Sequence, residues 1–384
     1  MQATNLAILK NAKIILRDSV LHGALALEAG RIAAVEPVEP ASGEALDCEG
    51  DYLLPGLIDL HTDNVEHHFF PRPSVRWPAT LDVVLAHDWQ MLGAGITTVL
   101  DSLAFGDYES GGARKAILQA AIECIDMAQA AGLLHTDHYL HFRCEVSDPA
   151  MLEIAEPNLD HPRLRLISIM DHTPGQRQWR DLAIYRAYRR QKRGQVWTDA
   201  EFEAHVVERR QVQEDYAVVF RAGLNQAARM RGLPLASHDD TTVADVEQSH
   251  AEGVTVSEFP TTIEAARHAR RLGMKTVMGA PNIVLGGSHS GNVGAATLAT
   301  EGLLDILASD YVPTSLLQAA FLLAERGTAL PEAVAMVTAN PAEAVGLKDR
   351  GRIEPGLRAD LLRVGLVAGA PVIRGIWRQG RRII

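Results

Sequence analysis

Apolar runs of strand length recur between residues 53 and 350, and most of them end in a polar or ionisable residue. Segments of helical pattern separate them, with apolar residues three or four positions apart and a glycine close behind, at 114–132, 199–232 and 261–273. Strands that alternate with helices predict βα units around a parallel sheet. Eight such runs predict an α/β fold with a closed (β/α)8 barrel: LLPGLIDLHTD, GITTVLDS, HYLHFRCEV, LRLISIMDH, LPLASHDD, VTVSEFP, MKTVMGAP and LDILASDY.

The two ends of the chain differ from this central pattern. Residues 6–50 contain short strand-like runs broken by turns, and residues 351–384 have the same texture. We therefore expect a small composite β-sandwich formed by 1–52 and 351–384, beside a barrel domain at 53–350. The segment 175–232 is long for one crossover between strands, so it is expected to contain an insertion with a role of its own.

The composition is that of an ordinary folded protein, with 384 residues of which 47% are hydrophobic and 22% charged. No stretch approaches the roughly 20 apolar residues that cross a bilayer. The first residues lack the basic start and apolar centre of a signal peptide, so we expect a cytoplasmic protein. Cys48, Cys124 and Cys144 lack the spacing of a disulfide framework or a thiolate zinc site, and are expected to be buried or idle.

The formal net charge of −11 bears on the partners of the chain. An acidic protein of this kind has no general surface for polyanions, so nucleic acid is not expected as a partner. The charge still permits a local basic pocket that binds a phosphorylated small molecule.

Ionisable residues stand at the ends of several predicted strands. The carboxyl ends of barrel strands meet at one mouth, so residues far apart in sequence become neighbours there. The strand-end residues that suit a metal ion are His61, Asp63, Glu145, His172, His238 and Asp310. His61 and Asp63 share a face of their strand and can bind one ion together. Six ligands exceed the needs of one tetrahedral ion and suit two divalent ions bridged by a carboxylate, for which Glu145 is the best candidate. Zn²⁺ fits this mixture, and Mn²⁺ or Fe²⁺ would use the same groups.

These residues also have alternative roles. A single histidine after an apolar strand is more often a hydrogen-bonded structural group than a ligand. Asp101, at the end of the second strand, could cap the next helix or orient a ligand. His67 and His68 could serve the surroundings of the site or the protein surface. The Arg-rich stretch after residue 175 could be a solvated helix face.

Several stretches carry a resemblance to a known family. LPGLIDLHTD, ASHDD, LDILASDY, VTANPAEAVGL and GRIEPGLRADLL resemble the amidohydrolase superfamily, whose members join a metal-bearing (β/α)8 barrel to a β-sandwich built from both termini. LHTDNVEHHFFPRPSVRWP, MDHTPGQRQW, ASHDDTTVADVEQSH, VSEFPTT and MGAPNIVLGGSHSGNV further resemble a diphosphatase branch from the carbon–phosphorus lyase pathway. The second likeness extends over the whole chain.

The resemblance implies roles for the strand-end residues. The first strand of the superfamily usually supplies two histidines, whereas Asp63 holds the second position here, as in the diphosphatase branch. Glu145 stands where many relatives have a carboxylated lysine or a glutamate that bridges two metals. His172 and His238 resemble the later imidazole ligands, although they follow the fourth and fifth runs rather than the usual fifth and sixth. Asp310 resembles the last-strand aspartate that binds metal and handles protons, and is the expected catalytic residue.

The branch resemblance also implies a reaction. It predicts hydrolysis of alpha-D-ribose 1-methylphosphonate 5-triphosphate to 5-phospho-alpha-D-ribose 1-methylphosphonate and pyrophosphate, in phosphonate catabolism. It implies a homodimer or a larger assembly as well. Two alternatives stay open: a deaminase or cyclic amide hydrolase with the same metal site, and a metal-dependent scaffold of the phosphonate-degrading apparatus.

A triphosphate substrate requires hydrogen-bond donors besides the carboxylate-rich metal site. The stretch NIVLGGSHSGNV after the seventh run allows close backbone approach at its glycines and offers four side-chain donors, Ser288, His289, Ser290 and Asn292. A flexible barrel loop is the alternative. Arg72 and Arg177, with Arg180, are further phosphate-binding candidates, because a guanidinium matches two phosphate oxygens at once.

Overall fold

The eight predicted strands form one parallel sheet in the computed structural model, which describes residues 7–36, 45–72, 75–106, 113–288 and 291–384. Its strands are β6 (Leu57–Thr62), β7 (Ile96–Phe105), β8 (Asp137–Glu145), β9 (Leu164–Met170), β10 (Leu235–His238), β11 (Val256–Glu258), β12 (Lys275–Gly279) and β13 (Ile306–Ala308). They pair in chain order from β6 to β13. A parallel bridge between Thr62 and Asp310 brings the two edges together. The predicted barrel is confirmed.

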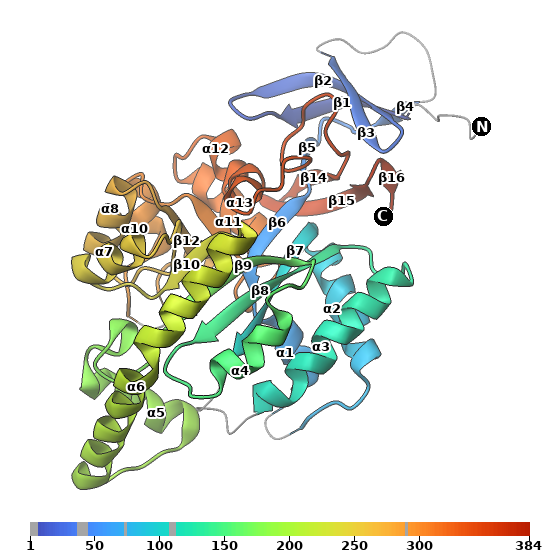
Figure 1. Ribbon diagram of the computed structural model, residues 1–384. Coiled ribbons are helices and arrows are strands. Elements are labelled where there is room, and N and C mark those ends of the chain that lie inside the picture. Colours follow the sequence, from blue (N-terminus) through green and yellow to red (C-terminus); the bar gives the residue numbers. More distant parts are fainter. Residues whose placement is uncertain (1–6, 37–44, 73–74, 107–112, 289–290) are drawn as a thin grey trace.

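Helices pack around this sheet (Figure 1). The three predicted helices correspond to α3 (Ala113–Ala130), α6 (Asp199–Arg231) and α8 (Ile263–Arg271). Thr198 and Glu201 form a capping box at the start of α6, and Gly232 ends it in a left-handed conformation. The remaining helices are α1 (Asn64–Phe69), α2 (Thr80–Gly93), α4 (Met151–Ala155), η1 (Glu156–Asn158), η2 (Arg177–Trp179), α5 (Leu182–Arg193), α7 (Val243–Ala251), α9 (Ala280–Leu285), α10 (Ala295–Thr300), α11 (Ser315–Glu325), α12 (Leu330–Ala335) and α13 (Ala339–Ala344).

An apolar cluster fills part of the barrel interior. Its members come from seven strands and from the segment after α13: Leu60, Leu100, Leu166, Ala236, Val256, Val277, Ile306, Ala308 and Val345. Side chains alternate along a strand, so Val256 and Glu258 share a face, as do Ala236 and His238. The apolar cluster therefore forms a floor, and the next inward-facing residues of the same strands are polar.

Both ends of the chain contribute to a second, mixed sheet (Figure 1). Its strands are β1 (Ala7–Ile15), β2 (Val20–Glu28), β3 (Arg31–Glu36), β4 (Ala45–Asp47), β5 (Tyr52–Pro55), β14 (Leu361–Val367), β15 (Ala370–Arg378) and β16 (Arg381–Arg382). The order is β16-β15-β14-β5-β1-β2-β3, with β4 beside β1. The two termini meet as predicted, in a mixed sheet in which β14 pairs directly with β5.

The change from this sheet to the barrel falls at one glycine. Gly56 separates β5 from β6, and a Cβ atom there would lie 2.2 Å from Oγ1 of Thr97. No larger residue fits without displacing the second barrel strand. The first barrel strand, which carries His61, thus follows the terminal sheet after one residue.

The segment predicted as an insertion forms η2, α5 and the first half of α6. Its aromatic rings pack on one another around Tyr185, which is fully buried and contacts Trp179, Phe202 and His205. The Tyr185 hydroxyl also lies 3.0 Å from Nε2 of His205. These rings are absent from the hydrophobic clusters of the barrel in the described part of the chain, so the insertion has a small core of its own.

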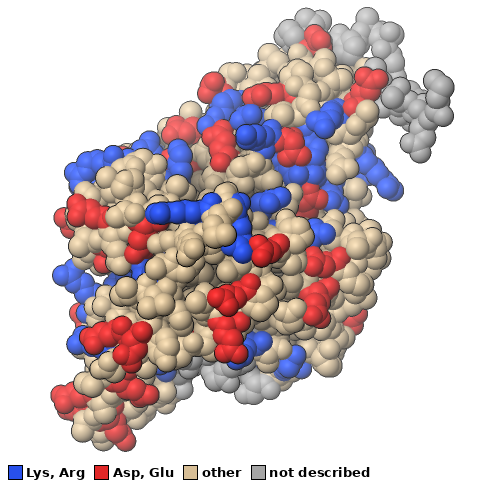
Figure 2. Space-filling model, viewed as in Figure 1, with Lys and Arg blue, Asp and Glu red and all other residues tan. Residues whose placement is uncertain are grey.

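Membrane-spanning helices, cysteines and surface charge were each addressed by predictions from the sequence. No helix in the described residues is long and apolar enough to cross a membrane. The three cysteines are buried and unbonded. On the face in Figure 2, basic and acidic side chains are interspersed, and acidic residues gather near the start of α6, so this face offers no broad basic surface.

Three arginines of the C-terminal segment converge on the first residue of β8. Nη1 of Arg350 and Nη1 of Arg358 lie 2.6 and 2.5 Å from Oδ2 of Asp137, and Arg378 pairs with Oδ1. Burial opposes ionisation, but the three guanidinium groups hold the pKa of Asp137 well below its usual range. Asp137 therefore fastens the barrel to the segment that enters the terminal sheet.

We expect Asp137→Asn to lower the free energy of unfolding by about 3 kcal/mol, because removal of one partner leaves buried charges uncompensated. A carboxylate with a lowered pKa stabilises the fold above the ordinary carboxyl pKa, and this contribution is lost as the pH falls toward its folded-state pKa. The difference between wild type and variant should therefore shrink in acid. Urea unfolding at several pH values measures it, and Asp160→Asn, at an exposed pair with Arg231, is the control. Equal stability of Asp137→Asn and wild type at neutral pH would contradict the assignment.

Candidate metal centre

A cavity of about 800 Å³ opens at the carboxyl ends of the barrel strands. All six predicted ligands line it: His61, Asp63, Glu145, His172, His238 and Asp310. Residues from five different strands or strand ends thus meet in one place, as the convergence of barrel strands requires.

Two groups of possible metal ligands lie in this cavity. One consists of His61, Asp63 and Asp310, and the other of His172, His238 and Asp239. Within each group, one ligand atom per residue lies within 4.8 Å of the others. Such sets of imidazole and carboxylate donors suit divalent transition metals.

Asp239 was absent from the sequence prediction, because neighbouring residues of a strand point to opposite faces. The strand ends at His238, and Asp239 adopts a left-handed conformation with φ of 60°. This turn brings an Asp239 oxygen to 3.6 Å from Nε2 of both His172 and His238. Asp310 ends the last strand in the same way, with φ of 58°. Aspartate tolerates this region better than most residues. The doublet in ASHDD was the available signal.

Glu258, at the end of β11, holds two of the histidines and was also missed. Its Oε1 lies 2.7 Å from Nδ1 of His61, and its Oε2 lies 3.0 Å from Nδ1 of His238 and 2.7 Å from the hydroxyl of Ser168. Burial alone would raise the pKa of Glu258, but these neighbours hold it well below its usual range. An ionised Glu258 accepts a hydrogen bond from the N–H at each Nδ1, which keeps both Nε2 atoms deprotonated and able to bind a metal ion.

Glu145 has a related contact with the third histidine. Its Oε2 lies 2.5 Å from Nδ1 of His172, and its Oε1 accepts hydrogen bonds from the Ser147 hydroxyl and the His172 amide. Glu145 lines the cavity but stands outside the groups of possible ligands in the described residues. Its observed contacts orient His172, and its predicted bridging of two metals stays a prediction.

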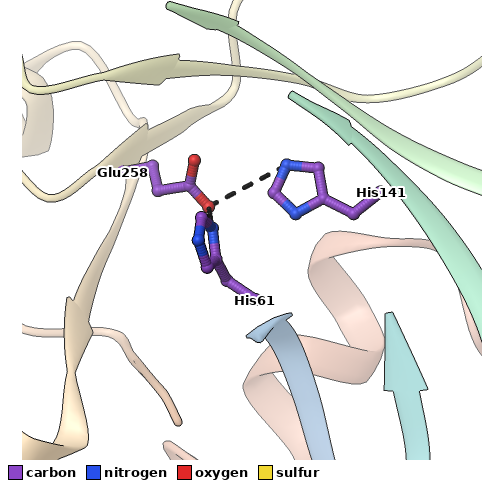
Figure 3. Close-up of side chains that lie close together, drawn as sticks. All are labelled: His61, His141 and Glu258. Atoms are coloured by element: carbon purple, nitrogen blue, oxygen red, sulfur yellow. Dashed lines mark hydrogen bonds and ion pairs between the residues drawn. The ribbon is translucent and has the colours of Figure 1, made fainter. Parts of the chain in front are cut away.

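His141 forms part of the floor beneath these residues. Figure 3 shows its ring beside Glu258 and His61, with Nε2 4.0 Å from Oε1 of Glu258. Its Nδ1 donates to the Leu60 carbonyl at 3.0 Å. Burial lowers the pKa of His141 to about 3, so the ring is neutral. By distance alone these three side chains could also hold an ion, but Nδ1 of His61 already donates to Glu258.

The carboxylates of the cavity attract positive charge to its histidines. Burial opposes protonation, but Glu258 and Asp63 raise the pKa of His61 to about 10. Glu145 and Asp239 likewise raise the pKa of His172 well above its usual value. Carboxylates that raise the pKa of neighbouring imidazoles also favour the binding of a divalent cation. Such binding requires the imidazole nitrogens that bind the ion to lose their protons. The residues present therefore fit a metal centre.

Arg143 lies beside the first group of ligands and was not predicted. It occupies β8 between His141 and Glu145, on the same face as both. It is buried and lines the cavity, and its Nη1 lies 2.5 Å from Oδ1 of Asp63. Asp63 directly follows β6, so this contact joins two strands that are separated by β7 in the sheet.

The predicted phosphate-binding residues have different positions. Ser288 and Asn292 line the cavity, whereas His289 and Ser290 lie outside the described residues. Arg177 is absent from the cavity lining, because its guanidinium pairs with the buried Asp240. Arg72, at the surface, and Arg180 do not line the cavity either.

Asp101 belongs to a buried network outside the cavity. It lies 2.7 Å from Nε2 of His87 and 2.8 Å from Nδ1 of His138, and Nε2 of His138 lies 3.3 Å from Asp88. Burial opposes protonation of His138, but the two aspartates raise its pKa to about 9. These hydrogen bonds satisfy the network without an ion, so Asp101 ties α2 to β7 and β8. His68 lies 2.8 Å from Gln90 of α2, and His67 is exposed.

Comparison with known proteins assigns the family. Residues 52–383 match the model of the amidohydrolase family. The chain belongs to this family. It is 44% identical, over 98% of its own length and 100% of the relative, to alpha-D-ribose 1-methylphosphonate 5-triphosphate diphosphatase of Escherichia coli (strain K12). It is 26% identical to imidazolonepropionase of Paracoccus denitrificans (strain Pd 1222), over 92% of both proteins.

Solved structures of this family share the fold. N-acetylglucosamine-6-phosphate deacetylase from Pasteurella multocida superposes with a TM-score of 0.60 at 15% identity, over 98% of this chain and 99% of that one. At this identity the likeness concerns the fold alone. The likeness covers both the barrel and the terminal sheet of this chain.

We expect Glu258→Gln to weaken metal binding about 10- to 100-fold, as loss of an orienting carboxylate does elsewhere. An amide oxygen accepts from one histidine only, and the amide NH₂ then faces the other Nδ1. That ring must place its proton on Nε2, which can no longer bind metal. Titration with Zn²⁺ in the presence of a chelator measures the affinity. Glu301→Gln, at the surface pair with Arg267, serves as control. Unchanged affinity of Glu258→Gln would refute the orienting role.

Proposed function

We propose that the chain hydrolyses alpha-D-ribose 1-methylphosphonate 5-triphosphate to 5-phospho-alpha-D-ribose 1-methylphosphonate and pyrophosphate. The observation that carries the proposal is the 44% identity to the Escherichia coli diphosphatase over the full length of that relative. The cavity supports it, because imidazole, carboxylate and hydroxyl groups converge there. The proposal describes a cytoplasmic metabolic enzyme, which acts as a homodimer or larger assembly.

Two divalent ions are part of the proposal. His61, Asp63 and Asp310 would hold one, and His172, His238 and Asp239 the other, with Glu145 bridging them or orienting His172. Zn²⁺ suits these donors best, and Mn²⁺ or Fe²⁺ would use the same groups. When bound, such ions would lower the pKa of a water molecule that binds them and would offset the negative charge of phosphate oxygens.

The reaction requires a base and a leaving group. We assign Asp310 to orient the attacking water and accept its proton. A bond forms between the water oxygen and the alpha-phosphorus, and the bond from this phosphorus to the oxygen shared with the beta-phosphate breaks. Pyrophosphate leaves with the electron pair of that bond, and the 5-phosphate stays on the ribose. Positioning and electrostatic stabilisation account for catalysis of this kind, so no serine or cysteine nucleophile is needed.

Binding of the phosphate chain draws on the loop after α9. Ser288 and Asn292 line the cavity and offer hydroxyl and amide donors to phosphate oxygens. The predicted donors His289 and Ser290 adjoin them in sequence. A deaminase or cyclic amide hydrolase, the second candidate, would prefer a neutral pocket, and adenine deaminase of Desulfatibacillum aliphaticivorans is 24% identical over 93% of this chain. A guanidinium and these donors in the cavity favour the phosphorylated substrate.

We expect Asp310→Asn to reduce kcat about 10²- to 10⁴-fold, because the amide cannot accept the proton of the attacking water. Phosphorus NMR of metal-loaded protein with the ribose triphosphate should show release of pyrophosphate by wild type and its near absence with the variant. Metal content is measured in parallel, since Asp310 also belongs to a ligand group. Release of single phosphate would place the attack at another phosphorus. No cleavage by metal-loaded wild type would contradict the proposal, and cyclic amides would be tried next.

A further inference from the structure

The charges around the cavity leave a deficit of positive charge for a triphosphate. Among the described residues that line it are four carboxylates, of Asp63, Glu145, Asp239 and Asp310, and one guanidinium, of Arg143, with no lysine. Two divalent ions would offset the four carboxylates. A triphosphate brings about four further negative charges, so the permanent charge of Arg143 becomes decisive for the net potential of the cavity.

Arg143 lies close to the residues that we assign to the attack on phosphorus. Its Nη1 lies 2.5 Å from Oδ1 of Asp63, and Oδ1 lies 3.6 Å from Nε2 of His61. Asp63 and His61 form one ligand group with Asp310, which we assign as the base. An oxygen of the phosphorus that is attacked beside this group comes within reach of the guanidinium.

The local structure fixes the guanidinium there. The alternation along β8 places His141 below Arg143 and Glu145 beyond it, so Arg143 is held between the floor and the rim of the cavity. Its side chain is 9% exposed, and Asp63, whose side chain is 20% exposed, is an ion-pair partner. Asp63 is also an expected metal ligand, so its charge would be shared between Arg143 and the ion.

We propose that Arg143 is a catalytic residue that donates a hydrogen bond to a non-bridging oxygen of the alpha-phosphorus. The inference rests on the proposed function. Negative charge on the phosphoryl oxygens and the leaving pyrophosphate must be stabilised as the P–O bond breaks, and a fixed guanidinium does so without reorganisation. The competing role is structural, in which Arg143 only holds Asp63 for the metal.

The test compares Arg143→Gln, Arg143→Lys and Arg143→Ala with wild type, using pyrophosphate release and metal content. We expect Arg143→Gln to retain its metal and to lose about 10²- to 10³-fold in kcat, with a smaller change in KM. Arg143→Lys should be intermediate, since an ammonium keeps the charge without the planar fork. Guanidinium ion at a non-denaturing concentration should restore part of the activity of Arg143→Ala. Arg267→Gln, at a surface pair, controls for loss of an arginine.

Several outcomes overturn the inference. An unchanged kcat in Arg143→Gln would do so. Loss of activity that follows loss of metal, and is reversed by added metal, would assign Arg143 the structural role instead. If metal-loaded wild type releases no pyrophosphate, the proposed function fails, and Arg143 is then tested by calorimetric binding of inorganic triphosphate. Equal affinity of wild type and Arg143→Gln for that anion would overturn the inference independently.

Discussion

The carboxylate of Glu258 is the constraint on which the rest of the centre depends. It joins His61 on β6 to His238 on β10, whose rings stack 5.9 Å apart at 22°. An ionised group in so buried a place persists only with donors on both oxygens, and the two Nδ1 atoms and the Ser168 hydroxyl provide them. The two groups of possible metal ligands thus share one anchor. A displacement of Glu258 changes both groups together, which makes the centre a single unit.

The barrel strands and the segments that connect them have different roles around Glu258. The strands hold the ligands above an apolar floor, where β-structure fixes each side chain rigidly. The cavity walls come from elsewhere: Tyr188 of α5, Leu285 of α9 and the loop that carries Ser288 all line it. The insertion that contains α5 has its own aromatic core, yet it also contacts the ligand-bearing strand ends. Arg177 pairs with Asp240, next to Asp239, and Gln213 donates a hydrogen bond to Asp171, next to His172. Changes in the insertion can therefore reach the metal centre as well as the cavity wall.

Much of the fold and about half of the site follow from the sequence. Apolar runs that alternate with helical patterns locate all eight strands, and the convergence of strand ends predicts six residues that line the cavity. Asp239 was not predicted, because its left-handed backbone breaks the alternation of side-chain direction along the strand, on which the prediction rests. Glu258 and Arg143 act through contacts with residues on other strands, which sequence spacing does not reveal. The pairing of Arg177 with Asp240 is equally invisible in the sequence, because the two residues lie far apart along the chain, and its predicted binding of phosphate stays a prediction.

The pairing of β5 with β14 has a consequence for the order in which the chain is assembled. Leu361 lies opposite Pro55, so a strand that precedes the barrel finds its neighbour only in a segment that follows the whole barrel. Until then one edge of β5 is open, and β6, which follows after Gly56, lacks a fixed starting point. Contacts between such distant segments form slowly, because a large loop must close first. A chain that lacks β14 would therefore expose an unpaired strand close to the first candidate metal ligands, where it could pair with another chain.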